Sequence, residues 1–193
     1  MESDLLRLKG VLAFFQDLTE EAWQDMKDLF SYADLPKGEY LVKEGEYTHS
    51  LAFVLEGVLR AFYLDKEGNY YNKTFFMENA LAVSLASVLQ RVPSALSFEA
   101  LVKTRILVAN YYEVSSLFDK HPCVERLVRK FLEYKWIKKE QREIRLVLND
   151  ATENYAFFQQ EYPGLENRIP QYHIASHLGI TPIQLSRIRA KQR

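Results

Sequence analysis

The sequence predicts an α+β protein. Two short N-terminal helices should precede an antiparallel β sandwich or small barrel, and one long helix should then lead to a small helical unit. Three observations predict this order: helical spacing of apolar residues near the N-terminus, short Val-, Tyr-, Phe- and Leu-rich runs between about Leu35 and Tyr112, and helical periodicity again from Pro122 onward. At 193 residues, the chain can form one large domain and a small second one.

The N-terminal segment, from about Ser3 to Tyr32, carries apolar residues at three- and four-residue steps. We expect two short helices there. The second is preceded by Thr19, a favourable N-cap, and begins with Glu20 and Glu21, which the helix dipole favours in a first turn.

The segment from about Leu35 to Tyr112 has the residue pattern of short strands. Turn-forming residues at 36–38, 44–46, 56–57 and 65–69 separate its apolar runs, a spacing that is typical of an antiparallel sandwich or small barrel. The glycines in these turns adopt positive φ without steric cost, so turn geometry alone explains them.

A long helix is predicted from Pro122, a favourable first helical residue, to about Asn149. At 1.5 Å per residue it would be roughly 40 Å long, which is more than a sandwich of this size can cover. We therefore expect it to pair with its copy in a homodimer and to place Phe131 and Ile144 in the seam; packing on its own sheet alone is the alternative. Its apolar members are Val124, Leu127, Phe131, Tyr134, Ile137, Ile144 and Leu148.

The segment 149–152 interrupts the apolar pattern and offers capping residues, which makes it a candidate hinge. A further helix from about Thr152 to Glu161 should end at Tyr162-Pro163-Gly164, because proline and glycine stop helices.

The stretch 170–189 fits two helices that cross at a tight turn. Ala175 is small where the helices must approach, Gly179 can adopt the left-handed conformation of the turn, Thr181 can cap the second helix, and Pro182 suits its first position. These are the requirements of a helix-turn-helix, whose second helix enters the major groove of DNA. The apolar residues that would join the two helices are Ile174, Leu178, Leu185 and Ile188.

The charge distribution supports a nucleic-acid partner. The formal net charge is only -1, yet no acid occurs from Asn167 to the C-terminus. A positive field at one end of a chain suits a polyanion, whose phosphates release counterions when they are neutralised. A solvated basic end is the alternative. The basic residues of this segment are Arg168, Arg187, Arg189, Lys191 and Arg193.

The remaining composition limits the compartment. A single cysteine, Cys123, excludes an intramolecular disulfide and points to a reducing environment. No apolar run approaches the ~20 residues of a membrane span, and the acids Glu2 and Asp4 do not suit a signal peptide. We expect a cytoplasmic protein that needs no cofactor.

In this order of elements the chain resembles the Crp/Fnr family of bacterial transcriptional regulators over nearly its whole length. Residues 35–41 and 44–46 are similar to the opening turns of that family's cyclic-nucleotide-binding jelly roll. The C-terminal part is similar to the branch common in Bacteroidetes, in the segments Tyr155, 162–163, 168–171 and 185–189.

The resemblance implies a sensor jelly roll at 1–121, a dimerisation helix at 122–149 and an all-α helix-turn-helix DNA-binding domain at 150–193. Family members usually add a small β wing after the recognition helix, whereas this sequence ends at Arg193, as that branch tends to do. The implied partners are double-stranded DNA, a second copy of the chain and RNA polymerase. The implied function is regulation of transcription rather than catalysis.

The resemblance also suggests which residues contact DNA. Arg187 matches the family's base-reading arginine, whereas Pro182 and Ile183 stand where well-known members carry polar readers. Helical spacing places Gln184 on the same face as Arg187, and Lys191 and Arg193 lie beyond that face, where they would contact phosphates. The full set of DNA-binding candidates is Gln171, Tyr172, Thr181, Gln184, Arg187, Arg189 and Lys191.

The ligand motif of the family is only partly present. Cyclic-nucleotide-binding members have a Gly-Glu pair for the ribose and an Arg-Ser-Ala for the phosphate. In this chain the corresponding positions are Ala82-Val83 and Pro93-Ser94-Ala95, so the effector should not be a standard cyclic nucleotide. The pocket would be empty or would take another ligand; its candidate residues are Ser84, Arg91, Ser94 and Ala95, with Arg91 either replacing the missing arginine or lying in solvent.

Two further features of the sequence bear on a metal site and on catalysis. His173 and His177 have the spacing of a metal pair but lack further ligands nearby, so we expect surface or phosphate-contacting histidines and no metal site. No nucleophile elbow, P-loop or Rossmann glycine motif occurs, and no enzymatic activity is predicted. The alternatives are a small-molecule-binding regulatory module whose C-terminal hairpin is only structural, and a cupin-like enzyme.

Overall fold

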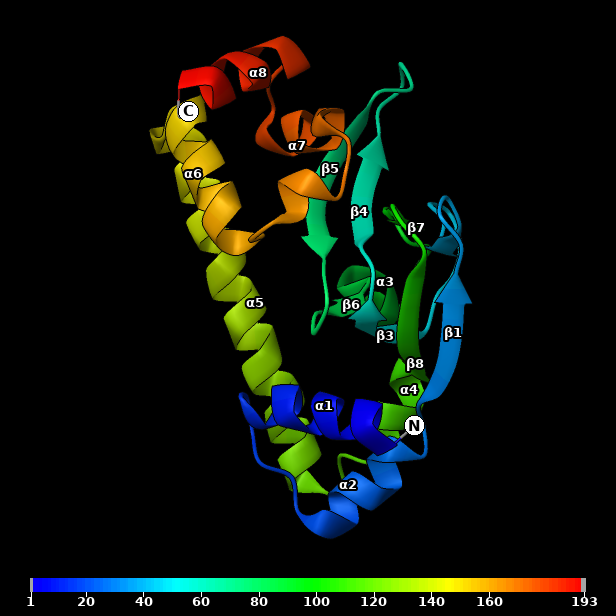
Figure 1. Cartoon of the computed structure of the whole chain (residues 1–193). Helices are drawn as coiled ribbons and strands as arrows, with labels where there is room; N and C mark the ends of the chain where they lie inside the picture. Colours follow the sequence, from blue (N-terminus) through cyan, green and yellow to red (C-terminus); the bar gives the residue numbers. More distant parts are fainter. Residues whose placement is uncertain (1, 192–193) are drawn as a thin grey trace.

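The computed structural model describes residues 2–191 and has the predicted α+β architecture (Figure 1). Two four-stranded antiparallel sheets form a jelly roll, with strand orders β1-β8-β3-β6 and β2-β7-β4-β5. The first strand begins earlier than the expected boundary at Leu35. The strands are β1 Ser31–Leu35, β2 Tyr40–Val42, β3 Ser50–Glu56, β4 Leu59–Leu64, β5 Tyr70–Phe76, β6 Leu81–Val83, β7 Ser97–Ala100 and β8 Thr104–Asn110.

The space between the two sheets is filled by small and aromatic side chains. Ala52 and Val54 of β3 face Ala61 of β4 and Phe98 of β7, and all four are essentially inaccessible to solvent. Small residues on facing strands let the sheets approach closely, and Phe98 stacks on the Phe76 ring at 5.7 Å between centroids.

Two predicted N-terminal helices are present, as α1 Glu2–Ala13 and α2 Glu20–Lys27. The Thr19 hydroxyl accepts a hydrogen bond from the Ala22 backbone N–H at 3.2 Å, which confirms the expected cap. These helices bury Leu8 and Met26 against the outer face of the β1-β8-β3-β6 sheet, in a second core that also includes Phe53. This second core joins the jelly roll to the start of the long helix.

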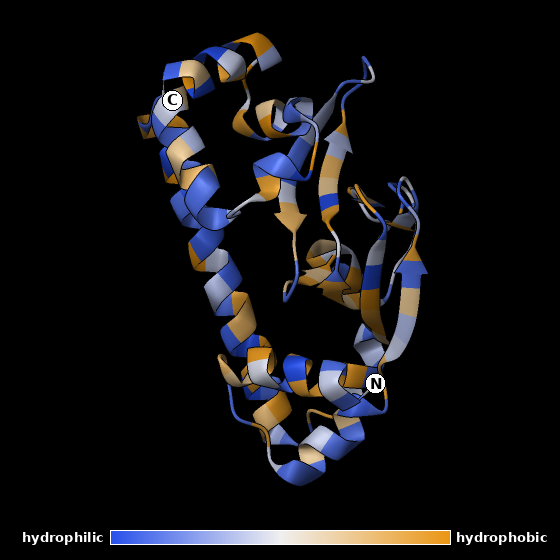
Figure 2. Ribbon diagram, viewed as in Figure 1, coloured by the Kyte–Doolittle hydropathy of each residue, from blue (hydrophilic) through white to orange (hydrophobic). Residues whose placement is uncertain are grey.

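The long helix is α5, Pro122–Leu148, with the predicted limits. Only its first part is buried, through Val124, Leu127 and Phe131. The expectation that Phe131 lies in a seam with a second copy is therefore wrong, because this ring packs in the chain's own core against Phe15. Ile144 is about half exposed, together with Ile137 and the residues that end the helix, and Figure 2 shows hydrophobic and hydrophilic residues interspersed along α5.

The C-terminal unit contains α6 Ala151–Glu161, the 3-10 helix Leu165–Asn167, α7 Gln171–Leu178 and α8 Pro182–Lys191. Asp150 begins α6 with a reciprocal capping box to Glu153, so the predicted break after α5 is a true helix start. Gly164 and Gly179 adopt positive φ of 76° and 68°, at the two turns where the sequence predicted a stop.

Two short helices were not predicted: α3 Leu85–Gln90, after β6, and α4 Tyr111–Ser116, after β8. Each spans fewer than two helical turns, which is too short for an apolar period to be recognisable. Within residues 2–191, no helix has the length and apolar character needed to cross a membrane.

Candidate DNA-binding surface and sensor pocket

The second helix of the C-terminal pair, α8, lies at the outer end of the molecule (Figure 1). Its start is fixed by a reciprocal cap. The Gln184 backbone N–H donates to the Thr181 hydroxyl at 3.2 Å, and Gln184 Oε1 accepts from the Thr181 backbone N–H at 2.9 Å. The Gln184 oxygen also accepts from the Thr181 hydroxyl at 3.1 Å, so only its amide hydrogens remain free.

The two faces of α8 differ in burial. Leu185 is fully buried, and Ile188 is partly buried, against a core that contains Ile174 and Ala175 of α7. Gln184 and Arg187 are exposed on the opposite side, as the helical period requires. The predicted base-reading pair therefore shares one accessible face.

The other predicted DNA-binding residues have different surroundings. Gln171 and Tyr172 are exposed at the start of α7, and Lys191 is exposed at the end of α8. Arg189 is only partly exposed, and its Nη1 is enclosed without a hydrogen-bond partner among residues 2–191. Arg193 lies outside the described residues.

One basic residue of the acid-free segment is used within the chain. Arg168 Nη2 lies 2.7 Å from Glu78 Oε1 and donates to the Gly57 carbonyl at 3.2 Å, and Arg168 Nη1 donates to Glu78 Oε2 at 2.8 Å. The guanidinium lowers the pKa of Glu78 to about 2. Arg168 thus ties the C-terminal unit to the jelly roll.

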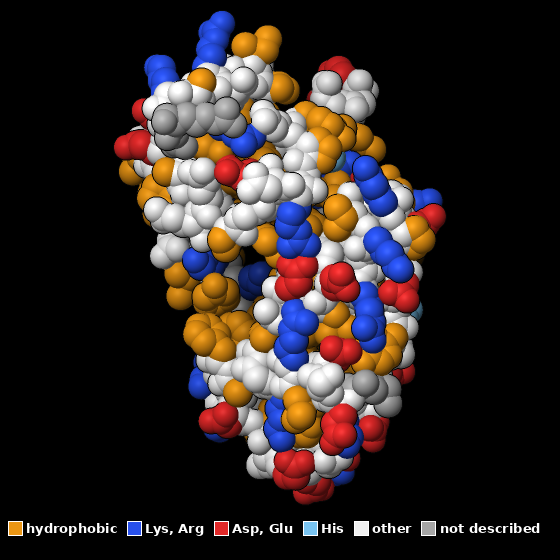
Figure 3. All heavy atoms as spheres, viewed as in Figure 1, with side chains coloured by type: hydrophobic (Ala, Val, Ile, Leu, Met, Phe, Trp, Pro, Cys, Tyr) orange, Lys and Arg blue, Asp and Glu red, His pale blue; other side chains and the backbone are white. Residues whose placement is uncertain are grey.

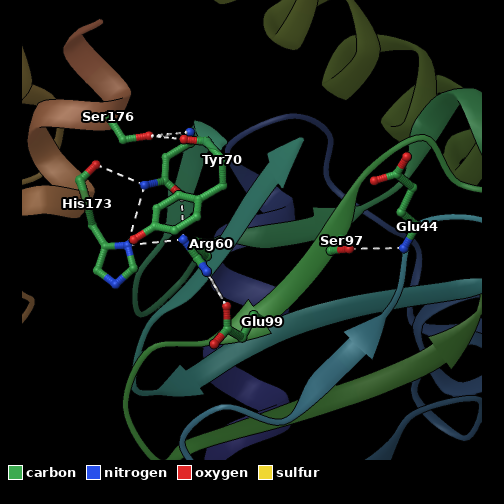
Figure 4. Close-up of polar contacts among 8 residues, drawn as sticks. Glu44, Arg60, Tyr70, Ser97, Glu99, His173 and Ser176 are labelled. Atoms are coloured by element: carbon green, nitrogen blue, oxygen red, sulfur yellow. Dashed lines mark hydrogen bonds and ion pairs between the residues drawn. The ribbon is translucent and has the colours of Figure 1, made fainter. Parts of the chain in front are cut away.

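The expectation that His173 and His177 lie at the surface is wrong. Both belong to α7 and are buried against β5, with 4% and 5% of their surface exposed. Figure 4 shows the His173 ring turned toward Arg60 of β4. Arg60 donates from Nη1 to His173 Nδ1 at 3.1 Å, and its other end pairs with Glu99 of β7.

The residue that links these groups is Asn72 of β5, which is fully buried. Its Oδ1 accepts from Arg60 Nη1 at 3.1 Å, and its Nδ2 donates to the His173 carbonyl at 3.0 Å. The Asn72 carbonyl lies 3.0 Å from His177 Nδ1. Every polar group of this side chain and the carbonyl therefore has a partner, as burial requires.

These partners determine the tautomers of the two histidines. His173 Nδ1 faces a guanidinium donor and must accept, whereas His177 Nδ1 faces a carbonyl and must donate. Burial, followed by nearby arginines, lowers the pKa of His173 to about 4 and of His177 to about 3. Both imidazoles are therefore neutral at physiological pH.

The hydroxyl of Ser176 completes the contact. It accepts from the Asn72 backbone N–H at 3.1 Å and donates to the Tyr70 carbonyl at 2.8 Å (Figure 4). Because β5 is the edge strand of its sheet, α7 satisfies backbone groups that would otherwise be open. We call the set Arg60, Asn72, His173, Ser176 and His177 the docking contact.

Two residues of the predicted sensor pocket are bonded to each other. Ser84 and Ser94 are buried, and their hydroxyl oxygens lie 2.9 Å apart. Ser94 donates to the Leu96 carbonyl at 2.7 Å, so Ser84 is the donor of the serine pair. Arg91 is exposed, ends α3 with a φ of 56°, and lies over the Tyr112 ring at 5.3 Å; Ala95 is exposed.

Val83, which stands at the family's ribose-binding position, faces the helical core rather than the space between the sheets. There it lines an apolar recess of about 500 Å³, part of it open to solvent, between the N-terminal helices, β3, β6 and α5. Among residues 2–191, the side chains that line this recess are apolar except for the phenol of Tyr111.

Comparison with known proteins assigns the jelly roll. Residues 33–121 match the family of the cyclic nucleotide-binding domain. No curated protein matches the chain by sequence. The matched segment contains β2–β8 and the loop of Ser84 and Ser94, so the cyclic-nucleotide-binding-like jelly roll expected from the sequence is confirmed.

Solved structures extend the likeness beyond this domain. The global regulator CLP of Xanthomonas campestris, described as responsive to c-di-GMP, superposes with a TM-score of 0.70 at 11% identity, over 90% of this chain and 91% of that one. FixK2 of Bradyrhizobium japonicum gives 0.69 at 19% identity, over 84% and 83%. The catabolite activator protein of Thermus thermophilus gives 0.59 at 20% identity, over 94% and 85%. The superpositions show a shared fold, and at these identities they show the fold alone.

Proposed function

We propose that this protein is a homodimeric, sequence-specific DNA-binding transcriptional regulator of the Crp/Fnr type, in the branch common in Bacteroidetes. The observation that carries the proposal is the accessible face of α8. Gln184 and Arg187 are both exposed on this face, and no Asp or Glu occurs from Asn167 onward. A recognition helix needs such a face, because acids would repel phosphates and buried polar residues could not reach bases.

In this proposal α8 enters the major groove and Arg187 hydrogen-bonds guanine through two atoms. Gln171, Tyr172, Thr181 and Lys191, which are exposed, are the further residues that contact DNA in this proposal. Arg189 would join them only after turning outward from its present half-buried position. RNA polymerase is the further partner that regulation of transcription requires.

The dimer rests on the exposed part of α5. Ile137, Ile144 and Leu148 follow one another at seven and four residues, with at least half of each side chain exposed. This is the spacing of a coiled-coil seam. Because the exposed stretch begins where the core contact at Phe131 ends, one helix can serve the core and the seam in turn.

The effector of the sensor is not a standard cyclic nucleotide. The loop that would bind the cyclic phosphate has Pro93 in place of arginine, and its serines are already paired. Two lost charge-assisted or polar bonds of roughly 1.5–3 kcal/mol each reduce affinity on the order of a hundredfold or more. We propose a regulator with a different ligand.

The test of DNA reading uses an operator selected from random duplexes. Arg187→Ala should weaken binding to this operator by roughly 1–3 kcal/mol and relax one base pair in each half-site. Lys191→Ala is the matched control, since loss of a phosphate contact should weaken operator and bulk DNA about equally and lower the salt slope by about one. Fluorescence anisotropy at two salt concentrations measures both; equal loss on both duplexes for Arg187→Ala would make it a backbone contact.

The test of the dimer uses Ile144→Asp, which places an unpaired charge in the proposed seam without touching the core. Sedimentation should show twice the chain mass for the wild type and the chain mass for the variant at micromolar concentration. Glu143→Asp, on the neighbouring exposed position, should leave the dimer intact. A wild-type monomer would contradict the seam.

A second candidate function has one observation in its favour. Because α7 covers the edge of β5, the C-terminal unit has a structural use that does not need DNA. A small-molecule-binding regulatory module with a structural tail would show this contact as well. If the wild type selected no sequence from random duplexes, this second function would replace the first.

A further inference from the structure

A cavity lies where the last part of α5, helix α6 and the end of α7 meet. It encloses about 350 Å³, part of it open to solvent, which suits a small ligand. Figure 1 shows α6 folding back along α5, with α7 on the side of the sheet. Figure 3 shows Lys or Arg atoms beside hydrophobic atoms on the surface of α5 just below α6. The cavity therefore lies at a junction of three helices whose surface combines charged and apolar groups.

Arg142 of α5 lines this cavity in a fixed orientation. Its Nη2 donates to the Tyr71 hydroxyl at 2.8 Å and to the His177 carbonyl at 3.1 Å. Within residues 2–191, its Nε and Nη1 make no hydrogen bond. Among the partly or fully buried residues of this range, Arg189 Nη1 is the only enclosed side-chain nitrogen or oxygen without a partner. The remaining donors of Arg142 are therefore open to solvent.

Arg145 lies one turn further along α5 and lines the same cavity. Residues three apart on a helix share a face. Its Nη2 lies 3.8 Å from Glu161 Oε2, which is beyond hydrogen-bond distance, and its guanidinium lies 4.9 Å from the centre of the Phe157 ring. A guanidinium over a ring uses its face and keeps the donors of its edge available. Both arginines thus offer donors to a ligand.

The cavity carries one uncompensated positive charge. Of the side chains that line it, Arg142 and Arg145 are cations and Glu161 is an anion. His177 is neutral, because burial lowers its pKa to about 3. One anionic group would balance the excess, whereas a dianion would leave a charge unpaired beside Glu161. Because the fork of an arginine matches the two oxygens of a carboxylate, the charges favour a single carboxylate.

Apolar side chains form much of the remaining lining. Phe157 is 40% exposed and Leu146 is 46% exposed, and Leu178, at the end of α7, is partly buried. Covering such side chains with an apolar group releases water and is favourable. A ligand should therefore join its carboxylate to an apolar body, and an aromatic ring suits the accessible ring of Phe157.

We propose that this cavity binds a small aromatic monocarboxylate. Its carboxylate accepts hydrogen bonds from Arg142 and Arg145, and its ring packs against Phe157 and Leu146. The site does not include the serines of the predicted sensor pocket. That the ligand is the effector rests on the proposed function. In that case it would tie α5, which carries the proposed dimer seam, to α7, which holds α8.

The test is saturation-transfer NMR of the full chain with sodium benzoate, in buffers matched for ionic strength with sodium chloride. Benzoate should bind saturably, and benzamide, which has the same shape without the charge, should bind about tenfold more weakly or less. Arg145→Met should weaken benzoate binding by about tenfold or more, because it removes one charge-assisted contact. Arg126→Met removes the same charge from an exposed position near the start of α5 and should bind benzoate as the wild type does.

Glu161→Gln supplies a readout of opposite sign. It removes the carboxylate that competes for Arg145, so it should tighten benzoate binding by about twofold to fivefold. Absence of saturable benzoate binding, equal binding of benzamide, weaker binding by Glu161→Gln, or equal losses in Arg145→Met and Arg126→Met would overturn the site. Displacement of benzoate by an equal concentration of inorganic phosphate would also overturn it, because the cavity would then prefer tetrahedral anions. DNA takes no part in these measurements, so their failure would leave the proposed DNA binding standing.

Discussion

The two helices of the C-terminal pair, α7 and α8, have opposite surroundings. α7 buries His173, Ile174, Ala175 and His177, and its two histidines and Ser176 are bonded to β4 or β5. α8 buries Leu185 alone, and its Gln184, Arg187 and Lys191 are exposed, whereas Arg189 is partly enclosed. One helix is used for attachment, and the other is free to bind.

In the proposed regulator, this difference bears on how a change in the jelly roll could control α8. α7 packs on β5, and α8 packs on α7 through Leu185. Its orientation relative to the jelly roll therefore follows from the docking contact. A ligand that shifts β5 would shift α7 and carry α8 with it, as a packed interface transmits small movements.

The largest expected effect that separates the two helices is the loss of the docking contact in acid. In the docked chain the pKa values of His173 and His177 lie near 4 and 3, below the usual 6.5. When the pH is below 6.5 but above these values, the two histidines therefore bind more protons in the undocked chain than in the docked chain. Stability from docking is complete above about pH 6.5 and declines as pH falls toward 4. At pH 4 the loss is about 3 kcal/mol for each histidine.

Hydrogen exchange measured from pH 7 down to pH 4, corrected for intrinsic rates, should show α7 losing protection before the jelly roll. Replacement of both residues by asparagine keeps a polar group near Nδ1 and removes the titration. In the double variant, α7 should therefore be less protected at pH 7 than in the wild type, and its protection should change less as the pH falls. Parallel pH profiles for the two proteins would contradict a titrating docking contact.

A smaller effect is expected from Asn72→Ala. The change removes two buried hydrogen bonds. One is donated by Arg60 Nη1 to Asn72 Oδ1, and the other is donated by Asn72 Nδ2 to the His173 carbonyl. The free energy of unfolding should fall by about 2–4 kcal/mol, as measured by urea denaturation.

Gln184→Ala, which removes one half of the cap of α8, should lower the free energy of unfolding by about 1 kcal/mol or less. If Asn72→Ala and Gln184→Ala lowered the free energy of unfolding equally, both helices would depend on the sheet to the same extent.

The main elements of the fold could be predicted from the sequence because their determinants are local. The cap at Thr19, the proline at the start of α5, the stop at Gly164 and the turn at Gly179 each act within a few residues. Such features need no knowledge of partners far along the chain. The family resemblance supplied the jelly-roll topology, which local patterns do not specify.

The docking contact could not be predicted in this way. His173 and its partner Asn72 are 101 residues apart, and an i, i+4 histidine pair has the same spacing on a buried face as on an exposed one. One indication was present in the strand sequence Tyr70-Tyr71-Asn72. Asparagine is disfavoured in strands, so its presence among aromatic residues suggests a buried polar group that needs partners.

The smallest expected effect concerns Ile183, which is 66% exposed in the first turn of α8 beside Gln184. In the proposed groove, Ile183 would contact the methyl group of a thymine, and Gln184, whose oxygen is bonded to Thr181, would act as a donor only. Replacing each thymine of the selected operator by deoxyuridine removes single methyl groups. At one position the wild type should lose about 0.8 kcal/mol, or about fourfold in affinity. Ile183→Ala should bind the two duplexes equally at that position, with the other positions as internal controls. If the wild type and Ile183→Ala lost affinity equally at that position, another side chain would contact the methyl group. Base reading by α8 would then depend on its polar side chains alone.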